Sequence, residues 1–196
     1  MATEPTDDRA LPVTAAPSSV QGLPARPQRR PAAVLGVLVL IAVVVLGLDQ
    51  LAKAWVLAHL PSDVPVHVIG NLLVFRRVLN SGAAFSLATG STWVFSIIAA
   101  GVVVFVAWFA RRIRSIAWAV LFGLLLGGTL GNLSDRLLRP PGFGVGEVVD
   151  FIQIPLLPAI FNLADSAIVT SMALFVLLTL RGVGLDGVRR SGARSS

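Results

Sequence analysis

Four long runs of apolar residues dominate the chain, and shorter, more polar stretches separate them. The runs cover residues 32–57, 91–110, 115–138 and 161–180. Each reaches the roughly 20 residues that a helix needs to cross the hydrocarbon core of a bilayer. Because lipid cannot satisfy backbone polar groups, a helix is the expected form for runs this long that lack strict alternation. The pattern therefore predicts four transmembrane helices.

A shorter apolar stretch between the first two runs predicts a small β-sheet. Residues 64–69 and 72–79 read as two strands around a turn at Gly70 and Asn71. This stretch is too apolar to be a solvated loop. We therefore expect a small sheet that lies on the membrane surface, close to a functional site.

The two ends of the chain differ from this core. Residues 1–31 are rich in proline and polar residues, a composition that cannot bury enough apolar surface to fold alone. A signal peptide is the alternative, because two arginines precede an apolar run, but that run is long enough to span and continues past Asp49. We expect a disordered cytoplasmic tail over 1–31, a four-helix membrane domain over 32–180 and a basic cytoplasmic tail over 181–196.

Composition supports the membrane assignment. Hydrophobic residues make up 55% of the 196 residues and charged residues 13%, and the mean hydropathy is +0.82. A soluble domain holds about 25% charged residues. The net charge of +6 does not indicate nucleic-acid binding, because most of the basic residues lie in the two tails and one short loop. The chain has no cysteine, which excludes disulfides, thiolate metal sites and a thiol nucleophile.

The arginines set the orientation of the predicted helices. Most of them precede the first run, fill the loop at 111–114 or follow the fourth run, and the other two loops hold Arg76, Arg77 and Arg139. The positive-inside rule then places both termini and this loop in the cytoplasm. The loops at 58–90 and 139–160 face outward. The predicted fold class is an all-α membrane protein with four transmembrane helices and a small extracytoplasmic β-sheet in the first outer loop.

Acidic residues gather on one side of this topology. Every acidic residue from Asp49 to Asp165 maps to the outer half of the membrane or to its outer surface. Carboxylates at membrane depth are costly and indicate a functional site by default. Two aspartates that share a site cannot both ionise easily, so one can activate water while the other donates a proton. We therefore predict that Asp150 and Asp165 form an aspartic-protease pair at the outer face.

Other chemistries fit the sequence less well. The two histidines, His59 and His67, lack the spacing of a metal-binding pair on one helix. No motif ties either of them to Ser134 or Ser166 as in a Ser-His-Asp system. We expect neither a metal nor a cofactor, because a carboxylate can activate water directly.

Two rival functions remain. A small carboxylate-based transporter would also use intramembrane acids, although it would normally place them along the crossing. In a non-catalytic scaffold the charges would only hold helices together. Whatever the function, the structural interpretation of Asp49 and Lys53 is a buried ion pair, since residues four apart share a helix face. Asp135 and the adjacent Arg136 would be another.

Five ordered blocks carry most of these polar residues. They are DQLAKAWV (49–56), NSGAAFS (80–86), GNLSDR (131–136), VVDFI (148–152) and FNLADSAI (161–168). Together they resemble the blocks of bacterial lipoprotein signal peptidases, also called signal peptidase II, over about residues 34–180. The resemblance implies a four-helix aspartic endopeptidase of the bacterial cytoplasmic membrane. Such an enzyme removes signal peptides from diacylglyceryl-modified prolipoproteins, cutting on the amino side of the lipidated cysteine.

The resemblance also implies roles for single residues. Asp150 and Asp165 match the catalytic positions, and Asn132 and Arg136 match positions that bind substrate backbone or orient the site. The other matched positions would support the site: Asn80, Asn162, Ala164, Asp135, Asp49 and Lys53. Implied partners are lipid-modified prolipoproteins, membrane lipids and a globomycin-type inhibitor. The predicted sheet resembles the membrane-surface cradle of the family.

The predicted topology can be tested with reporter fusions. A reporter fused after Arg112 should be cytoplasmic, because it follows the arginine-rich loop, and one inserted near Pro141 should be external. Reporters that are active on only one side of the membrane measure this directly. The opposite pattern would place the carboxylates on the wrong side for exported substrates.

Overall fold

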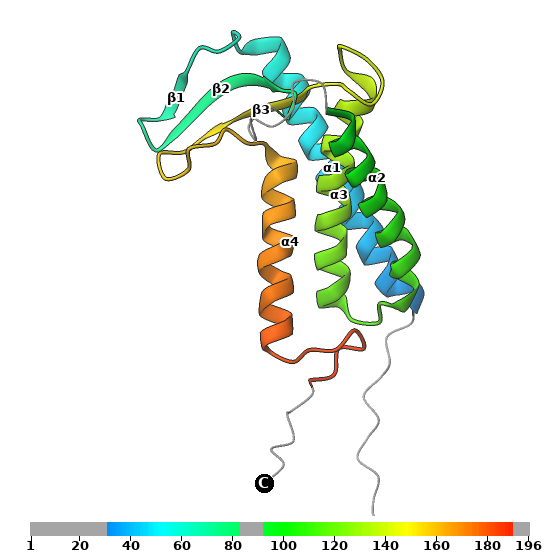
Figure 1. The fold of residues 1–196 in the computed structure, drawn as a ribbon. Helices are drawn as coiled ribbons and strands as arrows, with labels where there is room; N and C mark the ends of the chain where they lie inside the picture. Colours follow the sequence, from blue (N-terminus) through cyan, green and yellow to red (C-terminus); the bar gives the residue numbers. More distant parts are fainter. Residues whose placement is uncertain (1–30, 83–91, 190–196) are drawn as a thin grey trace, which may run out of the picture.

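The computed structural model describes residues 31–82 and 92–189. Four long helices form a bundle, and a small sheet extends from one end of it (Figure 1). The helices are α1 (Pro31–His59), α2 (Thr92–Phe109), α3 (Ile116–Leu138) and α4 (Leu163–Leu180). All four are long and apolar enough to cross a membrane. The prediction of four such helices is confirmed, and each boundary falls within two residues of its expected place.

Three predictions from the sequence fall wholly or partly on residues outside the described part of the chain. The N-terminal tail lies outside it except for Pro31. Residues 83–86 of the second sequence block and residues 190–196 of the C-terminal tail also lie outside it.

Helix α3 is the centre of the bundle and the most buried of the four helices. It contacts α1, α4 and α2. A Cβ atom added at Gly127 would lie 2.7 Å from the carbonyl oxygen of Ala42 in α1. A Cβ atom at the adjacent Gly128 would lie 2.5 Å from the carbonyl oxygen of Ala164 in α4. Two neighbouring glycines therefore let α1 and α4 approach α3 closely from two sides.

Short turns close the end of the bundle that lies away from the sheet (Figure 1). The 3-10 helix η2 (Ala110–Arg112) leads from α2 toward α3, and residues 181–189 turn back beneath the bundle. The indole Nε1 of Trp118 donates a hydrogen bond of 3.1 Å to the carbonyl of Val183. The main apolar core includes residues of this half of the bundle: Val34, Leu38, Val106, Trp118 and Phe122.

The sheet has three antiparallel strands in the order β1 (Val66–Ile69), β2 (Leu73–Asn80) and β3 (Val148–Gln153). The first two strands are those predicted, and Gly70 between them has a φ of 48°. The third strand was expected as part of an outer loop. Its first four residues are buried on both faces, so it lacks the alternation that identifies a half-buried strand.

The sheet is fixed to the bundle through the end of α1. The buried contact consists of Val56 and Leu60 from α1 with Val149 and Phe151 from β3. Because successive side chains of a strand point to opposite faces, Asp150 faces away from the two β3 residues in this contact. The sheet therefore holds Asp150 at the end of the bundle where α3 ends and α4 begins (Figure 1).

The close approach of α1 and α3 predicts a large effect of one added methyl group. Gly127→Ala should lower the free energy of unfolding by about 1–3 kcal/mol, because backbone atoms of α1 occupy the space that the Cβ atom needs. The matched control is Gly36→Ala, where nothing lies within 4 Å of the added atom. The control should be neutral or slightly stabilising. Unfolding in detergent micelles measures both variants, and equal stabilities would contradict the close contact.

Candidate active site

The residues predicted to form the site meet at the end of the bundle that carries the sheet. They come from five separate elements, and hydrogen bonds or ion pairs join all of them except Arg136 into one network. The contributors are Asp49 and Lys53 from α1, Asn80 from β2, Asn132, Asp135 and Arg136 from α3, Asp150 from β3, and Asn162, Ala164 and Asp165 at the start of α4.

Asn162 links the two aspartates predicted to be catalytic. It is the N-cap residue of α4, and its side chain accepts a hydrogen bond of 2.9 Å from the backbone N–H of Asp165. Its own backbone N–H donates to Asp165 Oδ2 at 3.1 Å, which completes a capping box. Its Nδ2 donates to Asp150 Oδ1 at 2.7 Å. One helix cap therefore holds Asp165 and reaches across to the strand that carries Asp150.

Each of the two carboxyl groups also accepts a hydrogen bond from a second amide. Asn80 Nδ2 donates to Asp150 Oδ2 at 2.8 Å, and Asn132 Nδ2 donates to Asp165 Oδ1 at 2.7 Å. All four carboxyl oxygens therefore have a donor. Such donors fix the orientation of both carboxyl groups before a substrate arrives.

The two carboxyl groups differ in their exposure to solvent. Asp150 is 3% exposed, whereas Asp165 is partly exposed. Burial raises the pKa of Asp150 to about 6, and the charge of Asp165 adds to this increase, while hydrogen bonds from Asn80 and Asn162 oppose it. This asymmetry suits acid–base hydrolysis, which needs one protonated and one ionised carboxyl group.

A buried ion network lies behind the pair. The side chain of Lys53 is fully buried, and its Nζ lies 2.8 Å from both Asp49 Oδ2 and Asp135 Oδ2. Asp49 thus pairs with Lys53 as predicted. Asp135 pairs with Lys53 and, at 2.6 Å, with Arg139. The ion pair between Asp135 and Arg136 that the sequence suggested does not form. Adjacent helical residues do not face each other, whereas residues four apart do.

Arg136 lies beside the pair and is 9% exposed. Its guanidinium lies over the ring of Phe95, 5.2 Å from the ring centroid. It interacts electrostatically with Asp150, Asp135 and Asp165. Its Nη1 atom is buried and has no hydrogen-bond partner among residues 31–82 and 92–189. A cation with an unused donor next to two carboxyl groups is suited to receive a carbonyl oxygen from a substrate.

Ala164 and Gly131 contribute through their small size. The backbone N–H of Ala164 donates to Asp49 Oδ1 at 3.0 Å. A Cβ atom at Gly131 would lie 2.6 Å from Asp49 Oδ2 and 3.1 Å from the Cβ atom of Ala164. Both residues must therefore stay small where α1, α3 and α4 meet around a buried carboxylate.

Sequence reasoning missed two members of the network. Gln50 Nε2 lies between 3.1 and 3.3 Å from Asp49 Oδ2, the carbonyl of Gly131 and Asp135 Oδ1. Arg139 is the other. Its position four residues after Asp135 was an available signal. Gln50 gave no such signal, because residues adjacent on a helix point in different directions and its acceptors lie mainly on another helix.

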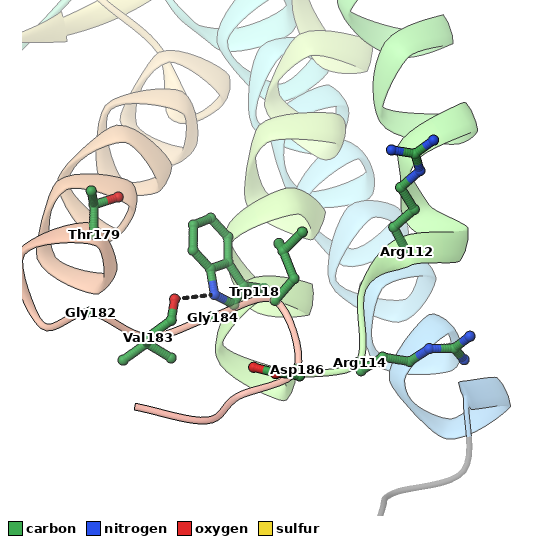
Figure 2. A pocket seen from close by; sticks show the side chains of 9 residues that line it. Arg112, Arg114, Trp118, Thr179, Gly182, Val183, Gly184 and Asp186 are labelled. Atoms are coloured by element: carbon green, nitrogen blue, oxygen red, sulfur yellow. Dashed lines mark hydrogen bonds between the residues drawn. The ribbon is translucent and has the colours of Figure 1, made fainter. Parts of the chain in front are cut away.

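A hollow of about 590 Å³ at the opposite end of the bundle lacks this chemistry (Figure 2). Its lining includes one carboxyl group, Asp186, and Figure 2 shows the side chains of Arg112 and Arg114 directed away from it. The hydrogen bond between Trp118 and Val183 belongs to the same region. The candidate active site is therefore identified by its side-chain network and not by the size of a cavity.

Fold and site together define a class: a multi-pass membrane enzyme with carboxyl groups gathered at one end of a helical bundle. Two solved structures, each described as a bacterial membrane enzyme structure obtained by the in meso method, have this fold. One is 30% identical, with a TM-score of 0.67 over 74% of this chain and 94% of that one. The other is 28% identical, with a TM-score of 0.67 over 80% and 94%.

Sequence comparison identifies the family. The signal peptidase (SPase) II family model matches residues 41–181. A lipoprotein signal peptidase of Leifsonia xyli is 60% identical over 90% of this chain and 84% of its own length. One of Mycolicibacterium smegmatis is 44% identical over 96% and 77%. The chain belongs to the signal peptidase II family, which is a family of aspartic peptidases.

Proposed function

We propose that this signal peptidase II removes signal peptides from prolipoproteins with Asp150 and Asp165 as its catalytic pair. The observation that carries the assignment is the bridge made by Asn162, which binds one oxygen of each carboxyl group at 2.7 and 3.1 Å. A pair held in common by one residue can act on the same peptide bond. The family membership supports this reaction, and the hydrogen-bond network supports the choice of these two residues.

The reaction needs one proton on the pair, so that one carboxyl group is protonated and the other is ionised. Asp150, the more buried, holds the proton, and Asp165 is ionised. Asp165 takes a proton from water as the water oxygen bonds to the scissile carbonyl carbon, and Asp150 gives its proton to the carbonyl oxygen. When the carbon–nitrogen bond breaks, Asp165 passes its proton to the leaving amine. Asp150 recovers a proton from the hydroxyl group that becomes the new carbonyl.

The neighbouring residues place the substrate in this scheme. Arg136 offers its Nη1 donor to a carbonyl group of the substrate backbone, and Asn132 orients the site. The substrate is a diacylglyceryl-modified prolipoprotein, cut on the amino side of the lipidated cysteine. Its acyl chains reach the site from the bilayer, because the network lies at the end of four membrane-length helices. A globomycin-type inhibitor should compete for the same place.

The site faces the outer side of the bacterial membrane in this proposal. The arginines of the loop at 111–114 lie at the end of the bundle opposite the sheet (Figure 1). The positive-inside rule puts that end in the cytoplasm together with both termini. The sheet and the carboxyl pair then lie where exported prolipoproteins emerge.

Replacing either aspartate tests the catalytic assignment. Asp150→Asn and Asp165→Asn should each lower cleavage of a lipidated prolipoprotein peptide by about 10²- to 10⁴-fold, because each removes one partner of the acid–base pair. The matched control is Asp63→Asn, an exposed aspartate that pairs with Arg76 away from the site. It should leave cleavage unchanged. If either variant is folded in detergent and still cleaves the peptide, the replaced aspartate is not catalytic.

The pH dependence tests the environment of Asp150. The alkaline limb of kcat/KM reports loss of the proton from the acid. Because the Asn80 hydrogen bond lowers the pKa of Asp150, Asn80→Leu should raise it and move this limb to higher pH by up to about one unit. Cleavage rates between pH 5 and pH 9 measure the shift. A limb that stays in place or moves to lower pH would show that Asp150 is not the acid.

A further inference from the structure

We propose that Lys53 is a positioning residue that fixes the orientation of the Asn132 amide, and that it thereby keeps the amide donor directed at the carboxyl group of Asp165. The inference rests on the proposed function, since it assumes that Asp165 is the base. It concerns a residue that lies behind the pair and contacts neither of the two carboxyl groups in the hydrogen bonds described above.

The contact geometry forms a short chain from Lys53 to Asp165. The ammonium Nζ of Lys53 donates to Asn132 Oδ1 at 3.0 Å. On the other side of the same amide, Asn132 Nδ2 donates to Asp165 Oδ1 at 2.7 Å. The amide of Asn132 therefore stands between a cation and a carboxylate, with its oxygen toward the cation and its nitrogen toward the carboxylate.

The chemistry of an ammonium group makes this orientation obligatory. Lysine can only donate hydrogen bonds, so the amide oxygen of Asn132 must face it. The NH₂ group must then face Asp165. If the amide rotated by half a turn, two donors would meet at Lys53 and two acceptors would meet at Asp165. A carboxylate that loses its donor and gains a facing oxygen is less stable in its charged form.

The other hydrogen bond to Asn132 is a weaker restraint. Asn162 Nδ2 also donates to Asn132 Oδ1, at 3.1 Å. The same NH₂ group lies 2.7 Å from Asp150 Oδ1 and 3.4 Å from the carbonyl of Val149. An NH₂ group with three acceptors in reach can give up one of them. Lys53 is therefore the group that holds the amide.

The charges around the pair favour this indirect role over a direct one. The charged groups that face it are Asp49 and Lys53 from α1, Asp135 and Arg136 from α3, and Arg139 just after α3. Lys53 already contacts two carboxylates at 2.8 Å. Its contact with Asp165 passes through the oriented amide, while its charge also acts directly on Asp150, where it lowers the pKa. The alternative is that Lys53 only ties α1 to α3.

The acidic limb of the pH profile separates these roles. Lys53→Met should move the acidic limb of kcat/KM to higher pH, with a loss on the order of tenfold at the acidic side that recovers toward alkaline pH. Lys53→Arg retains the donors and should restore the limb. The control is Asp63→Asn, which also removes one charge but lies away from the site, where Asp63 pairs with Arg76. The acidic limb of this control variant should not move.

Lys53→Met leaves two buried carboxylates with fewer partners, so its folding needs a safeguard. The double variant Asp49→Asn/Lys53→Met removes one of these charges, while Asp135 keeps Arg139. It should show the same limb shift. A loss of activity that is equal at all pH values in the folded variants would mean that Lys53 is only structural, and would overturn the proposal.

A double-mutant cycle tests the route through Asn132. If Lys53 acts by orienting this amide, adding Lys53→Met to Asn132→Ala should cause no further limb shift. Additive shifts would overturn the proposal. Failure of the catalytic assignment gives a different result, because Asp165→Asn would then retain cleavage. Loss of cleavage in Asp165→Asn with an unmoved limb in Lys53→Met would reject only the role of Lys53.

Discussion

The ion pairs of one buried ammonium group hold the polar end of this protein together. Lys53 is fully buried at 2.8 Å from a carboxylate of its own helix and from one of α3. Removing one partner of such a pair costs about 3–5 kcal/mol, because it leaves an uncompensated charge. The pairing therefore fixes the position of α1 against α3 along the helix axes. That position in turn sets Asn132, the residue through which α3 contacts Asp165.

Charge balance explains why a cluster this acidic is tolerated at the edge of a membrane. The pair and its surroundings hold four carboxyl groups and three cations: Asp49, Asp135, Asp150 and Asp165 with Lys53, Arg136 and Arg139. With one proton on the pair formed by Asp150 and Asp165 the cluster is neutral. The protonation state that aspartic catalysis requires is therefore also the one that minimises buried net charge. Structure and mechanism favour the same state.

Much of this arrangement follows from the sequence, and the remainder depends on tertiary contacts. Hydropathy locates the helices within two residues, since the bilayer requires long apolar runs. The grouping of Asp150 and Asp165 follows from topology. The strand β3 could not be predicted, because its first four residues are buried on both faces and show no alternation of apolar and polar residues. Nor could the pairing of Asp135, since its partner Lys53 lies 82 positions away along the chain.

The two aspartates differ because the chain presents them on different elements. Asp150 lies on a strand outside the helices, where it is 3% exposed, and burial raises its pKa to about 6. Asp165 is the third residue of an 18-residue helix. There its carboxyl group and the Asn162 side chain form the capping box of the helix. A strand and a helix N-terminus thus place two identical side chains in different surroundings, one buried and one partly exposed. The Asn162 cap contacts both carboxyl groups and so joins the strand to the helix.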